Sequence, residues 1–182
     1  MKKVISLLAF SVLTSAICIL YGNWQTLPDA KINFTIDGLF GADVKGTISD
    51  LKSTIRFYPD DVPRSSITTA IRPATINTGN KKRDNHLKTI DFLEVEKYSS
   101  ISFISKSFRQ IGEYYVVEGD LTLKDVTKPI TIPFEFINYG DSAVFRGDFN
   151  INRLDYHVGK RSHFMGNEVR IHLDIAVKKS LD

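Results

Sequence analysis

The sequence predicts an all-β fold of eight or nine short antiparallel strands, with one short helix on a connection between strands. Hydrophobic and polar residues alternate over many short segments, a pattern typical of strands that bury one face. Turn-forming residues separate these segments. With 182 residues and 42% hydrophobic content, the chain is long enough for one domain with a well-filled core.

The alternation runs from residue 32 to residue 177. It is regular in the last segment, where Val169, Ile171 and Leu173 alternate with charged or polar residues. The second and third segments count either as one bent strand or as two, so the total is eight or nine. The predicted strands cover residues 32–36, 44–48, 55–57, 67–71, 101–103, 117–123, 130–136, 145–151 and 169–177.

Proline, glycine, asparagine and aspartate mark the breaks between strands. Pro133 falls inside a strand pattern and predicts a bulge or a sheet edge, because proline cannot donate a ladder hydrogen bond. A longer polar loop is expected over residues 155–167. The other turn signals are residues 59–63, 77–80, Gly112 and 138–141.

One segment, residues 84–93, departs from the strand rhythm. Leu87, Ile90 and Leu93 recur there at helical spacing, and Asp84 precedes them as an N-cap. We therefore predict a short helix on the connection between two strands.

The first residues have the layout of a targeting segment. Two lysines precede an apolar run over residues 4–21, as in a secretory signal, and the run is also long enough to span a membrane. We expect residues 1–22 to be a signal peptide or a membrane anchor, and residues 29–180 to form the domain. The expected location is periplasmic or secreted, or membrane-anchored through the apolar run. The only cysteine, Cys18, lies in this run, and the bulky Ile17 before it disfavours acylation.

The parity of the alternation places one apolar face of each strand toward the interior of either a β-sandwich or a closed barrel, and the pattern alone does not decide between them. This face either fills a core, which composition alone favours, or lines a lumen for an apolar ligand. A lumen of this kind suits a long apolar chain, which gains about 25 cal/mol for each Å² removed from water. The predicted lumen residues are Phe34, Phe57, Ile67, Ile71, Phe103, Leu121, Phe134, Phe136, Phe149 and Ile171.

Several classes of function are disfavoured. A net charge of +3 is too small an excess for a nucleic-acid-binding protein. No metal site is expected, because His172 should point outward while His157 and His163 lie on a loop. No glycine-rich loop precedes a helix as nucleotide cofactors require, so no cofactor is expected.

Arg83, Asp84 and His86 form a polar cluster that we interpret as structural. Neither a second carboxylate nor a Ser/His pairing accompanies the cluster at a suggestive spacing, which argues against hydrolysis. Nearby basic residues either form a solvated loop, the slightly favoured interpretation, or contact anionic lipid head groups or a pyrophosphate. These basic residues are Lys81, Lys82, Arg83 and Lys88, with Lys160 and Arg161 as a second patch.

The stretch over residues 75–96, TINTGNKKRDNHLKTIDFLEVE, resembles the strand-to-helix segment of the YceI family. Further motifs of that family follow in order, so the resemblance covers nearly all of the expected domain. Asp125 stands where the family usually has glycine, and Leu93 where it has a second phenylalanine. The further motifs lie at residues 101–103, 119–123, 126–130, 151–156 and 166–169.

The resemblance implies an eight-stranded, lipocalin-like antiparallel barrel of a bacterial, usually exported protein. It further implies an elongated lumen that binds polyisoprenoid chains, without catalysis. We therefore expect a carrier for an isoprenoid-type or quinone-like lipid, with contact to a membrane surface. The alternative is an exported stress-response or interaction protein whose closed barrel acts through its surface loops. The sequence does not indicate the lipid's chain length or head group, or whether the protein is a monomer or a dimer.

Overall fold

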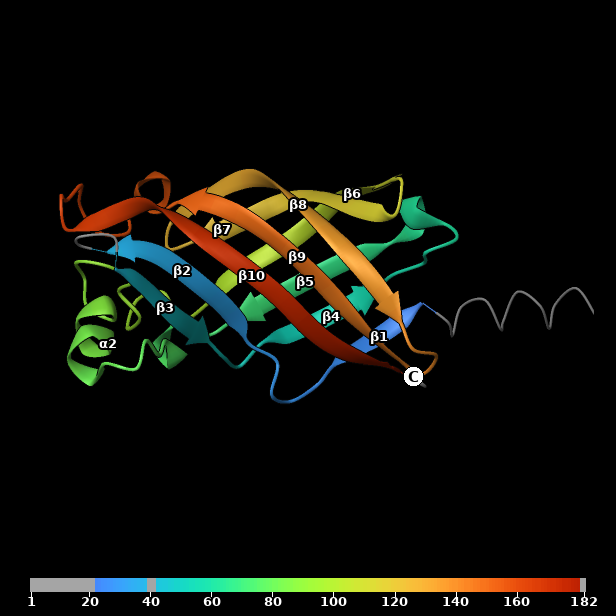
Figure 1. Cartoon of the computed structure of the whole chain (residues 1–182), viewed down its shortest axis with the longest axis horizontal. Coiled ribbons are helices and arrows are strands. Elements are labelled where there is room, and N and C mark those ends of the chain that lie inside the picture. The colour runs from blue at the N-terminus through green and yellow to red at the C-terminus, as the bar shows by residue number, and fades with distance from the viewer. Residues whose placement is uncertain (1–21, 39–41, 181–182) are drawn as a thin grey trace, which may run out of the picture.

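A computed structural model describes residues 22–38 and 42–180 and shows a closed antiparallel β-barrel (Figure 1). The expected targeting segment lies outside the described residues. Among the described residues, no helix has the length and apolar character needed to cross a bilayer. The strands are β1 (Asn23–Thr26), β2 (Ile32–Gly38), β3 (Asp43–Ile48), β4 (Lys52–Arg56), β5 (Ser66–Ile71), β6 (Ile101–Ile111), β7 (Tyr114–Leu123), β8 (Val126–Asn138), β9 (Ser142–Asn152) and β10 (Met165–Lys179).

The barrel has eight strands because two of them are interrupted. β1 and β2 are the two halves of the first strand, since both pair with β10 on one side. β3 and β4 are the halves of the second, since they pair with β2 and β1 respectively. Each later strand pairs with the next, and β10 returns to the first strand. The predicted eight-stranded antiparallel barrel is thus confirmed, and its first strand begins before residue 29, where the sequence placed the domain boundary.

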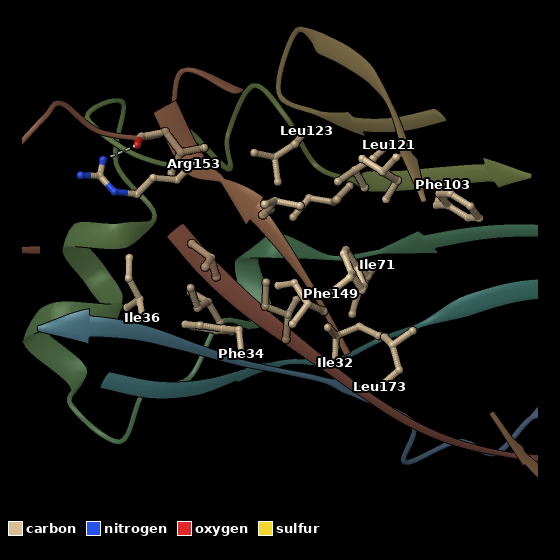
Figure 2. A pocket seen from close by; sticks show the side chains of 18 of the residues that line it. Ile32, Phe34, Ile36, Ile71, Phe103, Leu121, Leu123, Phe149, Arg153 and Leu173 are labelled. Atoms are coloured by element: carbon tan, nitrogen blue, oxygen red, sulfur yellow. Dashed lines mark hydrogen bonds between the residues drawn. The ribbon is translucent and has the colours of Figure 1, made fainter. Parts of the chain in front are cut away.

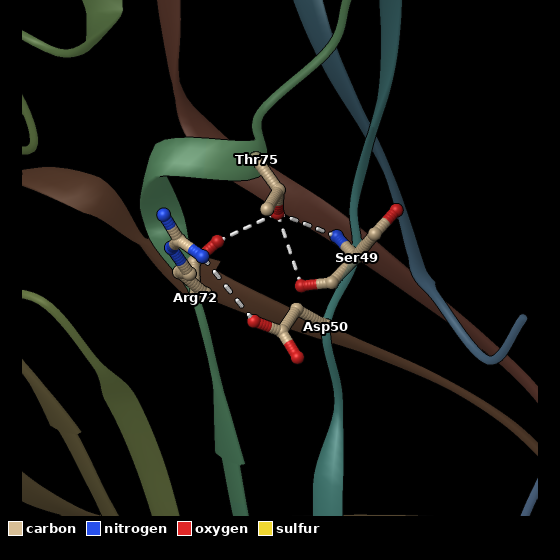
Figure 3. Close-up of polar contacts among 4 residues, drawn as sticks. All are labelled: Ser49, Asp50, Arg72 and Thr75. Carbon is tan, nitrogen blue, oxygen red and sulfur yellow. Dashed lines mark hydrogen bonds and ion pairs between the residues drawn. The ribbon is translucent and has the colours of Figure 1, made fainter. Parts of the chain in front are cut away.

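The seam beside β3 is closed without a regular ladder. The backbones of Thr47 and Asn77 exchange two hydrogen bonds of 2.9 Å. Two residues further along each segment, the Thr75 hydroxyl accepts a hydrogen bond from the Ser49 N–H at 2.8 Å (Figure 3). Short 3-10 turns lie at Val62–Arg64, Pro73–Thr75 and Arg153–Tyr156. The segment after β5 therefore replaces a strand as the neighbour of β3.

The predicted turns are present between the strands. Gly112 and Gly140 take the left-handed conformation in the β6–β7 and β8–β9 hairpins, with φ of 60° and 89°. Pro133 lies in continuous register with Val116 of β7, so no bulge interrupts that ladder. On its other side, pairing with β9 starts only at Glu135, so Pro133 occupies an edge-like position.

The helix α2 (Lys81–Leu87) begins and ends earlier than predicted. Its N-cap is Asn80, whose side chain accepts a hydrogen bond from the Arg83 N–H at 3.1 Å. The prediction that Asp84 caps the helix was wrong, because Asp84 lies inside the first turn. Its carboxylate instead accepts hydrogen bonds from the N–H and hydroxyl of Thr78, which precedes the helix.

Candidate functional site: the barrel lumen

The barrel encloses an apolar cavity of about 600 Å³ that occupies the half nearest α2 (Figure 2). Its wall comes from nearly all strands, together with α2 and the loops beside it. The few polar residues in the wall include Thr26 and Ser53, whose hydroxyls bond each other at 3.2 Å. The labelled apolar side chains that point into it are Ile32, Phe34, Ile36, Ile71, Phe103, Leu121, Leu123, Phe149 and Leu173.

Aromatic side chains pack solidly in the opposite half of the barrel. Phe57 is fully buried at their centre, and its ring lies 4.8 Å from Phe136 and 5.4 Å from Phe145, centroid to centroid. Trp24 closes the cluster by donating its indole N–H to the Phe57 carbonyl at 3.3 Å. Phe145 also lines the cavity, so the cluster forms its floor. The complete aromatic cluster is Trp24, Phe57, Phe108, Tyr115, Phe134, Phe136 and Phe145.

The cavity lining includes most of the predicted lumen residues. Phe57 and Phe136 are exceptions: the structure places both inside the aromatic cluster and neither on the cavity wall. A ligand-binding role for the others remains a prediction. Those that line the cavity are Phe34, Ile67, Ile71, Phe103, Leu121, Phe134, Phe149 and Ile171.

Two glycines keep the lumen wide at its aromatic positions. A side chain at Gly46 would place its Cβ 2.4 Å from the ring of Phe34, which faces Gly46 directly on the paired strand. Likewise, a Cβ at Gly119 would lie 2.5 Å from the ring of Phe103. Each ring therefore lies across a glycine, which has no side chain that would push the ring further into the lumen. In the sequence, these places can be recognised by a glycine at an inward-facing position of a strand.

At the α2 end, Arg153 is a buried cation that sequence reasoning missed. It is 3% exposed, and its guanidinium donates to the carbonyls of Val158, Lys160 and Gly166 at 2.8 to 2.9 Å. A fourth hydrogen bond reaches the Asn167 side-chain oxygen at 3.3 Å. Burial lowers the pKa of Arg153. Because these acceptors lie in the loop before β10 and in the first residues of β10, Arg153 ties that loop to the start of the strand.

The predicted structural cluster lies at the same end. The Arg83 guanidinium donates to the hydroxyl and carbonyl oxygens of Thr78 at 2.7 and 2.9 Å. Together with Asp84, Arg83 ties α2 to the segment that pairs with β3, and Arg83 also lines the cavity. His86 lies outside this network, 3.8 Å from Asp91 and with most of its side chain exposed.

The histidines singled out in the sequence lie apart from the lumen. On the outer face, His172 Nδ1 is 2.5 Å from Asp148, and its Nε2 is 3.3 Å from the Thr35 hydroxyl. His157 lies 3.5 Å from Asp125 in a different loop. Within residues 22–38 and 42–180, no group of three potential ligands is placed to hold a metal.

Comparison with known proteins supports the resemblance. The YceI-like domain model matches residues 24–177. Protein YceI of Escherichia coli O157:H7 is 31% identical over 135 residues, which cover 71% of each chain. Burkholderia cenocepacia BcnA aligns with a TM-score of 0.77 at 21% identity over 81% of this chain and 95% of its own. A polyisoprenoid binding domain from Saccharophagus degradans aligns at 0.69 and 12% identity, over 87% and 99% of the two chains. Because the family model spans residues 24–177 and protein YceI is 31% identical over 71% of the chain, the chain belongs to the YceI-like domain family.

Proposed function

We propose that the barrel binds and carries a long isoprenoid-type lipid, polyisoprenoid or quinone-like, between a membrane and the aqueous space outside the cytoplasm. The apolar cavity carries this proposal. A solved relative of the same fold is a polyisoprenoid binding domain, which gives the ligand class. The proposed role needs no catalysis, because binding and release of a lipid make and break no covalent bond.

The exposure pattern of the inward side chains supports a lumen that accepts a ligand. Phe149, Ile171 and Leu173 are only half-buried although they line the interior, because their exposed surface faces the cavity. A volume of about 600 Å³ lies within the range of about 300–1,000 Å³ that is usual for small-molecule sites. A chain that buried about 400 Å² there would gain about 10 kcal/mol by transfer from water.

The alternative of a closed barrel acting through its loops requires a lumen filled by its own side chains. Only the aromatic half meets that requirement, since Phe57 is fully buried there. The half nearest α2 retains the cavity. The open half therefore favours the carrier over the closed interaction protein.

The test is native mass spectrometry of the protein purified from its own host, followed by delipidation and re-addition of an isoprenoid alcohol. We expect a co-purified lipid of several hundred daltons and its uptake again after removal. The variant Ile171→Trp should reduce uptake at least tenfold, because the indole occupies the lumen.

Ile104→Trp is the matched control. Ile104 is 55% exposed on β6 and does not line the cavity, so the same substitution there should leave uptake unchanged. Melting temperatures of both variants establish that they are folded. Absence of lipid in the native protein, together with no uptake by the delipidated protein, would refute the carrier function.

A further inference from the structure

The cavity reaches the surface at the α2 end of the barrel. Phe164 lines the cavity and yet leaves 69% of its surface exposed, so it stands at the opening. The loops around it are in contact, since a Cβ at Gly159 would lie 2.8 Å from the Phe92 ring. Figure 1 shows α2 and the loop before β10 at this same end. The opposite end is sealed by the aromatic cluster.

This end combines exposed apolar side chains with cations. Ile90, in the loop after α2, is 73% exposed, the largest value among the exposed hydrophobic side chains of the described residues. Several basic residues lie in α2 and in the loops beside it, and within the described part of the chain none of them forms an ion pair. We define the mouth face as Lys81, Lys82, Lys88, Ile90, Lys160, Arg161 and Phe164.

Most carboxylates in the same loops are already engaged. Asp91 lies 3.8 Å from His86, and Glu94 lies 3.9 Å from Lys124. Asp125 lies 3.5 Å from the imidazole of His157. The mouth face itself holds five cations and no carboxylate, which gives an excess of positive charge beside its two exposed apolar residues.

We propose that the mouth face docks on an anionic lipid bilayer, so that a ligand passes between bilayer and lumen without crossing water. This inference rests on the proposed carrier function and names its partner surface. Basic side chains are attracted to anionic head groups, and exposed apolar side chains enter the interface between head groups and acyl chains. Exposed apolar residues at the sealed end, such as Ile111 and Tyr114, instead flank the acidic Glu113.

The experiment is flotation of residues 23–182 with vesicles of phosphatidylcholine containing about one third phosphatidylglycerol, at about 0.1 M salt. Barrel closure by β1 and β10 places both ends of the fold inside this span. We expect at least tenfold weaker binding to pure phosphatidylcholine. Lys81→Glu/Lys82→Glu should weaken binding to the anionic vesicles at least tenfold, since each cation removed costs about fivefold. Ile90→Glu should weaken it about fivefold or more.

Ile111→Glu is the control, because it introduces the same charge at a similarly exposed isoleucine of the sealed end. Equal effects of Ile90→Glu and Ile111→Glu, or equal binding to neutral and anionic vesicles, would overturn the proposal that the mouth face docks on an anionic bilayer. Loss of a dimer in Ile90→Glu, measured by light scattering, would assign the face to a second copy and also overturn the proposal.

Uptake of an isoprenoid alcohol from detergent micelles, measured on the same proteins, separates the two proposals. Intact uptake without vesicle binding would overturn docking and leave the carrier function standing. Intact vesicle binding without uptake would support the mouth face as a membrane surface and refute the carrier function.

Discussion

The two halves of this barrel share one strand pattern but differ in what their inward side chains do. Around Phe57, aromatic rings from the four strands β6 to β9 lie at centroid distances of 4.8–6.2 Å, and Phe57 itself is fully buried. Around Phe149 and Ile171, the inward side chains are mostly aliphatic and half-buried against a cavity. The closed half stabilises the fold, and the open half holds the cavity on which the proposed ligand binding rests.

This contrast implies that stability and ligand binding can be altered separately. Side chains in the closed half are closely packed against one another, so removing one of them creates a new void. In the open half a void already exists, so the same removal forfeits fewer contacts, while adding volume displaces a ligand. Substitutions in the closed half should therefore lower stability more than ligand binding. Substitutions in the open half should lower ligand binding more than stability.

The largest stability effect is expected for Phe57→Ala, at about 3–5 kcal/mol, because a fully buried ring is removed from a saturated cluster. The matched substitution Phe149→Ala, on the cavity wall, should cost much less. Urea denaturation of the delipidated proteins measures both free energies of unfolding. Equal costs would show that the open half is as tightly packed as the closed half, contrary to the comparison.

The next effect is expected for Arg153→Met, at about 3 kcal/mol, because it leaves several buried carbonyl oxygens without donors. Arg146→Met is the control, since Arg146 is half exposed and lies 3.6 Å from Asp174 on the outer face. Such a surface pair is worth about 0–1 kcal/mol. Urea titrations compare the two, and limited proteolysis should cut the Arg153 variant first in the loop before β10.

The barrel and most of its wall could be predicted because both depend on local signals. Alternation assigned the inward face, and turn residues such as Gly112 placed the hairpins. Which inward residues form the aromatic cluster and which line the cavity could not be predicted. Phe57 and Phe149 both occupy inward positions and differ only in their neighbours from distant strands. Arg153 was missed for the same reason: three of its four acceptors are backbone carbonyls, which every residue type has.

The helix boundary shows where a local signal is ambiguous. Asp84 and Asn80 both belong to residue types that cap helices well, and the sequence does not indicate which of the two side chains accepts a hydrogen bond from the first turn. The structure resolves this through Thr78, whose N–H and hydroxyl take up the Asp84 carboxylate. Nothing in the periodicity of residues 84–93 reports that contact.

A smaller effect, on binding more than on stability, is expected for Gly46→Ala in the open half. Its Cβ would lie 2.4 Å from the Phe34 ring, so the ring must move into the lumen and narrow it. We expect weaker lipid uptake with a stability loss of about 1–2 kcal/mol. Adding Phe34→Leu should restore uptake, because the shorter side chain relieves the clash. A double-mutant cycle measured by native mass spectrometry checks this, and purely additive losses would contradict it.

The smallest effect concerns an outer-face pair between β6 and β7. The Arg109 guanidinium bonds the Glu118 carboxylate and holds the pKa of that carboxyl below its ordinary value of 4.5. A carboxyl whose pKa falls on folding adds stability above pH 4.5, and this stability is lost as the pH falls through the folded-state pKa. Glu118→Gln should therefore flatten the acid side of the stability profile and lower stability slightly at neutral pH. Glu113→Gln, in the exposed β6–β7 turn, is the control, and urea titrations between neutral pH and acid compare them. Since the pair lies outside the lumen, lipid uptake at neutral pH should be the same in both variants; a loss specific to Glu118→Gln would show that the outer wall also governs the cavity.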